Sequence, residues 1–147
     1  MSYSKIKRFD EQKYLENVYS SVTFLYLCGE IKSNIDKPLF KFAALQEAYD
    51  FLESLPQPAR QKIFYNIRKV AGGVKDAELF KKLENSEIWE FRTLYQGIAY
   101  RLFAFWDKDA ETFVIATHGL VKKTQKTPKK EIEKAEAIRH EYFANKH

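Results

Sequence analysis

Two arginines, Arg92 and Arg101, flank a turn signal in the most regular part of the sequence. If Gln96-Gly97 is a two-residue hairpin turn, these arginines lie directly opposite each other on adjacent strands. Like charges opposed on a sheet are unfavourable by roughly 0.2–1 kcal/mol, so a compensating group is expected. In one interpretation, Glu90 lies diagonal to Arg101 and neutralises one arginine while the other is solvated. In the other, the pair forms a phosphate cleft, because guanidinium groups suit the non-bridging oxygens of a phosphodiester and its transition state.

His118 is the residue best suited to proton transfer near these arginines. If residues 107–110 form a four-residue loop between two strands, His118 falls opposite Ala99, diagonal to Arg101 and on the arginine face. A one-residue change in that loop would reverse the face. An imidazole with its ordinary pKa of about 6.5 suits general acid or base work, although a lone histidine is more often structural. Its place beside two arginines and a lysine cluster favours the catalytic interpretation.

The lysine-rich stretch after His118 carries the charge excess of the chain. Residues 122–130 hold five of the 25 basic residues and no acidic one, and the net charge of the whole chain is +5. A localised positive charge favours an anionic partner and a salt-dependent association. Lys122 and Lys123 leave the predicted strand end beside His118, where they could bind the same phosphate. The other three lysines are predicted to form a broader surface for a phosphate backbone: Lys126, Lys129 and Lys130.

Other kinds of site find little support in the composition. A single cysteine, Cys28, permits no internal disulfide and no thiolate metal cage. The five glycines form no phosphate-binding loop and the three histidines lack metal-ligand spacing, so neither a cofactor nor a metal is expected. The apolar stretch at residues 18–28 lacks a signal-peptide cleavage site, and no run approaches the roughly 20 residues of a membrane span. The sequence thus predicts a soluble cytoplasmic protein.

The elements that must position these residues begin at Leu39. A chain of 147 residues, 45% of them hydrophobic, suits one folded domain. The short apolar stretch "LFKFAAL" after Pro38 predicts a strand. Two helices should follow, because apolar residues recur at helical spacing on both sides of Pro56. Their buried faces would consist of Ala48, Phe51, Leu52 and Leu55 in the first helix, and Ala59, Ile63, Ile67 and Val70 in the second.

Three strands should then form an antiparallel meander, since "IWEFRTLY", "IAYRLFAFW" and "TFVIATHG" are rich in aromatic and β-branched residues and are separated by turns. In the predicted register, Tyr95 and Trp106 point toward the core beneath the helices. Thr127, as the N-cap, and Pro128 predict the start of a final helix. Its apolar stripe would consist of Ile132, Ala135, Ile138 and Tyr142. The predicted fold class is therefore α+β: a helix hairpin packed on a small antiparallel sheet, with an N-terminal strand and a C-terminal helix.

The motifs around these residues resemble those of a known family. The stretches "LFKKLENSEIWEFRTLYQGIAYRLFAFW" and "THGLVKKTQKTPKKEIEKAEAIRHEYF" are similar to the phage-derived HigB-like branch of the RelE/ParE toxin superfamily. The signature is an E-F-R strand, a Y-R strand, an H-G turn, and K-K-T-x-K-T-P-x-x-E-I before the last helix. The resemblance runs from about Leu39 to Phe143. It divides the chain into a RelE/HigB-like toxin domain at residues 39–147 and an N-terminal extension at residues 1–38, whose structure the sequence leaves open.

The resemblance implies a RelE-like fold and a toxin of a type II toxin–antitoxin system. Such toxins are ribosome-dependent mRNA interferases, that is, metal-free endoribonucleases that need no cofactor. The ribose 2′-OH attacks the adjacent phosphate, which releases a 5′-OH fragment and leaves a 2′,3′-cyclic or 3′-phosphate. The implied partners are the ribosome, mRNA and a helix-turn-helix (HigA-like) antitoxin.

The resemblance also implies roles for individual residues. Arg92 and Arg101 would hold the scissile phosphate and its transition state, and His118 would be general acid or base. Lys122 and Lys123 would bind phosphate and stabilise the leaving group. The residues implied to bind RNA or the ribosome are Lys126, Lys129, Lys130, Tyr95 and Glu90.

Two other functions remain open on this scaffold. The superfamily includes poisons of DNA gyrase, which bind their target without chemistry of their own. A third possibility is an inactive module that only binds an antitoxin. A shared fold does not decide among these functions, because activity depends on the site that the fold carries.

Overall fold

The computed structural model describes residues 38–109, 111–123 and 126–146. Within them the chain forms a mixed α+β structure with one five-stranded sheet and three helices, compatible with the RelE-like fold. The elements, in chain order, are β1 (Lys41–Ala44), α3 (Gln46–Ser54), α4 (Gln57–Ala71), β2 (Phe80–Lys82), β3 (Trp89–Tyr95), β4 (Ile98–Asp107), β5 (Phe113–Lys122) and α5 (Lys129–Ala144). The expectations for residues 1–37 lie outside the described residues.

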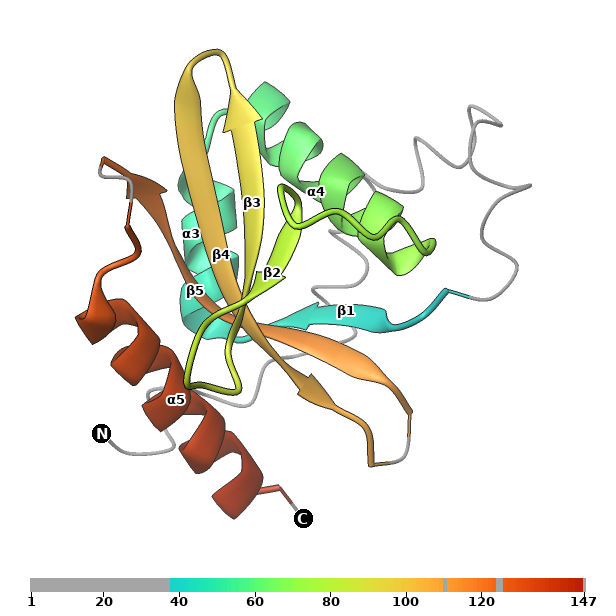
Figure 1. Cartoon of the computed structure of the whole chain (residues 1–147), viewed down its shortest axis with the longest axis vertical. Helices are drawn as coiled ribbons and strands as arrows, with labels where there is room; N and C mark the ends of the chain where they lie inside the picture. The colour runs from blue at the N-terminus through green and yellow to red at the C-terminus, as the bar shows by residue number, and fades with distance from the viewer. Residues whose placement is uncertain (1–37, 110, 124–125, 147) are drawn as a thin grey trace.

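The sheet has the strand order β1-β5-β4-β3-β2 (Figure 1). Strands β2 to β5 form an antiparallel meander, which confirms the predicted meander of β3 to β5, and the predicted N-terminal strand β1 pairs with β5 in parallel, an orientation that the sequence had left open. A parallel pair needs a long connection, which the helices and the intervening strands supply. Strand β2 was not predicted, because three residues are too few to show an alternating pattern.

The β3–β4 hairpin has the predicted register. Gln96 and Gly97 have φ values of 50° and 77°, as a two-residue hairpin turn with two left-handed positions requires. Tyr95 therefore pairs with Ile98, and successive pairs along the ladder bring Arg92 directly opposite Arg101. The hairpin prediction is confirmed.

The β4–β5 register differs from the prediction. Phe103, not Ala99, lies opposite His118, because β4 runs through Asp107 and β5 begins only at Phe113. The longer loop by itself would have moved His118 to the other face. A register shift between Phe103 and Ala104 moves the ladder by one further residue and restores the predicted face. His118 is therefore diagonal to Arg101, as expected, but at a different place along the sheet.

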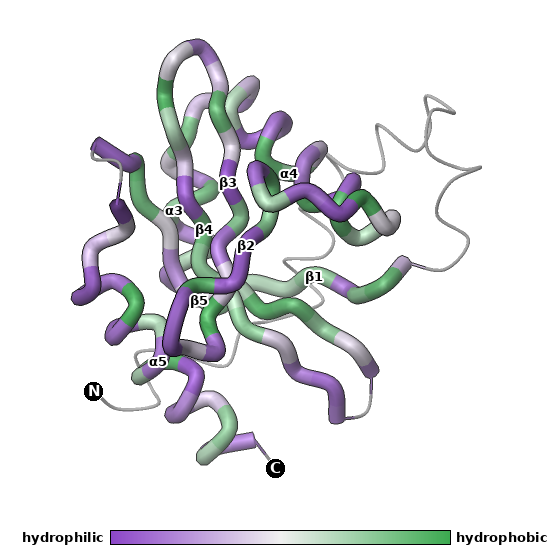
Figure 2. The backbone as a smooth tube through the Cα atoms, viewed as in Figure 1, coloured by the Kyte–Doolittle hydropathy of each residue, from purple (hydrophilic) through white to green (hydrophobic). Residues whose placement is uncertain are grey.

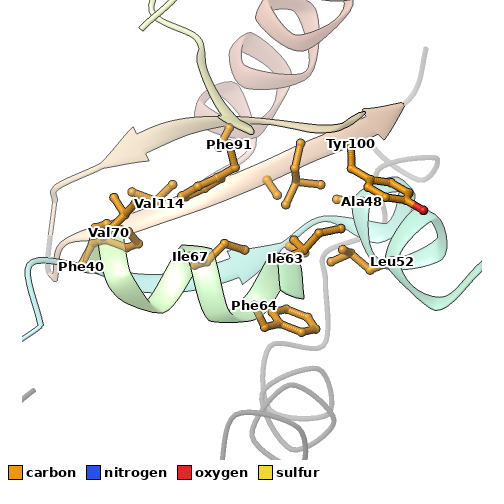
Figure 3. Close-up of a cluster of buried hydrophobic side chains, with 14 of the residues drawn as sticks. Phe40, Ala48, Leu52, Ile63, Phe64, Ile67, Val70, Phe91, Tyr100 and Val114 are labelled. Atoms are coloured by element: carbon orange, nitrogen blue, oxygen red, sulfur yellow. The ribbon is translucent and has the colours of Figure 1, made fainter. Parts of the chain in front are cut away.

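Helices α3 and α4 cover the face of the sheet opposite the arginines. The apolar residues predicted for α4 are buried, and Figure 3 shows Ile67 and Val70 facing Phe91 and Val114 of the sheet. Burial of such side chains is the main favourable term in folding. One buried polar contact crosses this layer, from Asn66 Nδ2 to Thr93 Oγ1 at 3.1 Å. The helix-hairpin prediction is confirmed.

Helix α5 covers part of the arginine face and creates a second core. Phe103 and Phe105 are buried there against Ala135 and Ile138 of α5. The predicted apolar stripe of α5 is confirmed, but its packing over the arginine face was not predicted. In Figure 1 the helix lies on the side of the sheet away from α3 and α4, and in Figure 2 green, hydrophobic stretches of β4 and β5 lie at the middle of the sheet beside the purple residues of β2. Among the described residues, α5 leaves a groove beside the arginine end of this face.

Gly119 lies inside β5 and not in a turn, so the expected H-G turn is wrong. A Cβ atom at this position would overlap the ring of Phe51 on α3. Glycine is needed here because helix and strand approach closely, not because the backbone has a positive φ. This contact helps to fix α3 on the sheet.

Within the described part of the chain, no helix is both long and apolar enough to cross a membrane.

Candidate functional site

The two opposed arginines share one carboxylate. Glu90 Oε1 lies 3.2 Å from Arg101 Nε and 3.5 Å from Arg92 Nε. Glu90 is 2% exposed, so the charge of its carboxylate is compensated by the neighbouring cations and hardly by solvent. One carboxylate against two guanidinium groups leaves an excess of positive charge. Both interpretations of the arginine pair are thus compatible with the geometry, since Glu90 offsets the repulsion without cancelling the charge.

The guanidinium groups keep hydrogen-bonding capacity. Arg92 Nη1 donates to Ala77 O at 3.3 Å and Arg101 Nη1 donates to Tyr100 O at 3.2 Å. Neither buried Nε has a hydrogen-bond partner of good geometry among the described residues, although both are close to Glu90. A guanidinium group has five N–H donors, and only one donor of each arginine makes a hydrogen bond of good geometry within the described residues.

Lys122 joins this cluster from β5. It lies opposite Ala99 on the arginine face and diagonal to Arg101. Partial burial lowers the pKa of Lys122; the nearby cations Arg101, Arg92 and Lys81 act in the same direction, and Glu90 opposes them. Burial also lowers the pKa of Arg101, with Arg92 acting in the same direction and Glu90 and Glu78 opposing. The fold therefore holds several cations close together although they repel one another, as in sites that bind anions.

A groove of about 1110 Å³ opens over the cluster, between the start of α5 and strands β2 and β3. Its basic end is lined by Lys81, Glu90, Arg92, Lys122, Lys126 and Lys129. Arg101 lies beneath this surface, where its side chain is 10% exposed. Lys81 was missed by the sequence analysis because it belongs to the unpredicted β2, where it pairs directly with Glu90.

Thr127 closes the groove on one side through a contact that the sequence did not reveal. Its hydroxyl donates a hydrogen bond of 2.7 Å to Glu90 Oε2. The predicted N-cap role of Thr127 is wrong, because Pro128 occupies that position and no side chain caps the helix. The hydroxyl is used to hold the segment before α5 against the arginine pair. This contact places Lys126 and Lys129 beside the groove.

His118 lies away from the groove, beneath the first turn of α5. It is 3% exposed and stacks on Phe103 with ring centroids 4.8 Å apart. Its Nδ1 is 3.0 Å from Thr117 Oγ1, and its Nε2 is 3.1 Å from Glu131 Oε1. Glu131 is a partner that the sequence analysis missed. With both ring nitrogens engaged, His118 is placed to seat α5 and not to reach a phosphate over the arginines.

Burial lowers the pKa of His118, and Lys134 acts in the same direction, against the opposing effects of Glu131 and Glu47. A folded-state pKa below that of the unfolded chain makes protonation favour unfolding. The contribution of His118 to stability is therefore present above about pH 6.5 and is lost as the pH falls.

We expect His118→Gln to flatten the dependence of the free energy of unfolding on pH between about pH 7.5 and pH 5. The measurement is urea unfolding of both chains across this range. His140→Gln is the matched control, because His140 is an exposed residue of the same helix. Identical pH profiles for the His118 variant and the unchanged chain would contradict this account.

The other predicted site residues are distributed around the groove. Lys123 and Lys130 are exposed and do not line it. Lys129 is 89% exposed, with its Nζ 3.9 Å from Glu133 Oε1, as expected of a peripheral electrostatic contact. Tyr95 packs against the core beneath α3 and α4, on the face opposite the arginines. The structure therefore brings together Glu90, Arg92, Arg101 and Lys122, with Lys126 and Lys129 at the edge.

Comparison with known proteins places this site within a described family. A family model described as phage-derived protein Gp49-like (DUF891) matches residues 50–140. The matched span contains both arginines, the lysines of the groove and most of α5. No curated protein matches the chain.

Proposed function

The chain belongs to the Gp49-like family of phage-derived proteins, a toxin-like family of the RelE/HigB type, and from this premise we propose that it is a ribosome-dependent mRNA endoribonuclease. It would be the toxin of a type II toxin–antitoxin system and would act in the cytoplasm. Its proposed partners are the ribosome, mRNA and a helix-turn-helix antitoxin. The observation that carries the proposal is the group formed by Arg92, Arg101 and Lys122 around Glu90, at the basic end of a groove.

In the proposed reaction the ribose 2′-oxygen attacks the adjacent phosphorus and the bond to the 5′-oxygen breaks. Arg92 and Arg101 bind the non-bridging oxygens and stabilise the charge that develops on them, which is where preorganised donors have the largest effect on rate. Glu90, whose two oxygens are engaged by the arginines and by Thr127, holds the guanidinium groups in place, and the proton of the 2′-hydroxyl passes to water in the groove. Lys122, whose pKa is lowered, donates a proton to the leaving 5′-oxygen. The products are a 2′,3′-cyclic phosphate and a 5′-OH end.

This assignment departs from the sequence analysis in the role of His118. Its two nitrogens are engaged by Thr117 and Glu131, and it does not line the groove. We therefore assign His118 to the support of α5. Lys123 and Lys130 are exposed and could contact ribosomal RNA, while Tyr95 has no place in the proposed site.

The proposal predicts new mRNA 5′ ends when the chain is produced without an antitoxin. The measurement is genome-wide mapping of 5′-OH ends after induction in bacterial cells, together with growth. A purified-component assay with and without ribosomes, in the presence of EDTA, tests the ribosome requirement and the metal-free chemistry. Growth arrest with intact mRNA would overturn the proposal, and DNA breaks under the same conditions would select the gyrase alternative. Unaffected growth with intact mRNA would point to an inactive antitoxin-binding module.

A further inference from the structure

The outer face of α4 carries a second concentration of positive charge. The helix contains Arg60, Lys62, Arg68 and Lys69 and no acidic residue. Arg60 pairs with Glu53 at 3.5 Å. No carboxylate of the described residues lies within 4.0 Å of the other three cations. This helix packs on the sheet face opposite the groove, so its charge is separate from that of the candidate active site.

Lys62, Arg68 and Lys69 of α4 gather around one aromatic ring. Lys62 Nζ, Arg68 Cζ and Lys69 Nζ lie 4.8, 5.1 and 5.5 Å from the centroid of the Tyr65 ring. The ring attracts each cation, but three like charges around one ring repel one another. Arg68 Nε is also buried without a hydrogen-bond partner among the described residues. The repulsion among the three cations would be relieved by an anion with several acceptor oxygens bound at their exposed ends.

The spacing on the helix suits a phosphate backbone. Lys62, Tyr65 and Lys69 lie three and four residues apart, so they share one side of α4, and the core residues Ile63 and Ile67 lie on the other. A row of cations along a helix can contact successive phosphates, and arginine adds planar, multidentate binding. The side chains are partly exposed, and their stems lie along the tyrosine ring.

We propose that Lys62, Tyr65, Arg68 and Lys69 form a second RNA-binding surface that contacts the phosphate backbone of structured RNA. Together with the groove on the other face, it lets the chain contact RNA from two sides. A surface of this kind carries no sequence information, because phosphates are the same in every sequence. The inference rests on the proposed function in one respect, namely that ribosomal RNA is the natural source of the structured RNA.

The experiment uses the full chain with Lys62→Gln and Lys69→Gln together. Binding to a fluorescein-labelled RNA duplex is measured by fluorescence anisotropy between about 50 and 200 mM salt. We expect roughly ten-fold weaker binding, and a salt dependence shallower by about one to two units of slope, because each lost phosphate contact removes about 0.7–0.9 of a unit. The matched control is Lys41→Gln with Lys108→Gln, which removes the same charge elsewhere. This control should bind the duplex like the unchanged chain.

Two outcomes would overturn the inference. Equal affinities and salt slopes in the α4 variant and the control would show that α4 contributes only its net charge. Unchanged duplex binding, with loss of binding to poly-glutamate, would assign the surface to an acidic protein partner instead. The mRNA cleavage assay on the unchanged chain is read separately. Failure of cleavage with a clear α4 effect on duplex binding would reject the proposed function and retain this surface.

Discussion

The chain with Glu90→Gln and Arg101→Gln is expected to stay folded and to cleave mRNA about 10²–10³-fold more slowly, as when one preorganised donor to a transition state is removed. The buried carboxylate and its buried guanidinium partner are replaced together, so neither charge is left without the other. Thr127 can still donate its hydrogen bond to the side-chain oxygen of glutamine. The measurement is the single-turnover cleavage rate on ribosomes, with thermal unfolding to verify the fold.

The matched control removes an exposed ion pair of the same charges, with Lys41→Gln and Glu111→Gln. Their atoms lie 3.0 Å apart on the surface, where such pairs contribute little. This control should cleave mRNA like the unchanged chain. If the Glu90/Arg101 variant cleaves at the normal rate while remaining folded, the arginine pair is not the phosphate site.

Arg101→Gln alone is expected to lower the free energy of unfolding by about 3 kcal/mol, because it leaves a buried carboxylate with reduced compensation. Glu90 is 2% exposed and would retain only Arg92 at 3.5 Å and the hydroxyl of Thr127. An arginine that only lined a phosphate cleft could be replaced at little cost in stability. The burial of Arg101 changes that expectation, since breaking a buried pair costs more than removing it whole.

Equilibrium urea unfolding of four chains measures this effect: the unchanged protein, Arg101→Gln, Glu90→Gln, and the double variant. A stabilising interaction between the two residues requires the double variant to lose less stability than the two single losses added together. Additive losses would mean that Glu90 and Arg101 do not interact, whatever their distance. The same chains show whether loss of activity in Arg101→Gln follows from lost stability or from lost phosphate binding.

The local elements of this fold could be read from the sequence because their causes are local. The helix hairpin follows from apolar residues at helical spacing on both sides of Pro56, and burial of Ile63, Ile67 and Val70 confirms it. The parallel pairing of β1 could not be read in this way. Its partner β5 is far along the chain, and the choice between parallel and antiparallel pairing depends on where α3 and α4 place the strand.

The candidate site also has some features with local causes and others that depend on distant parts of the chain. The opposition of Arg92 and Arg101 was predictable, because a two-residue turn and the alternation of side chains along a strand determine it. The burial of His118 was not, because it depends on α5 folding back over the sheet and on a register shift in β4. The sequence around His118 is the same whether a helix buries the side chain or solvent surrounds it, so the local pattern cannot distinguish the two cases.

By itself the sequence determined the three helices, every strand but β2, the opposed arginines and the concentration of lysines from the end of β5 to the start of α5, since each depends on neighbours in the chain. Only the tertiary structure decided which of these charges meet. Glu90 and Thr127 are 37 residues apart in sequence, and their hydrogen bond exists because α5 must cover Phe103 and Phe105. Packing of that second core brings the segment with Lys126 and Lys129 against the arginine pair, and it buries His118 beneath α5, away from that pair. Burial of apolar surface, which no local pattern specifies in full, is the physical reason.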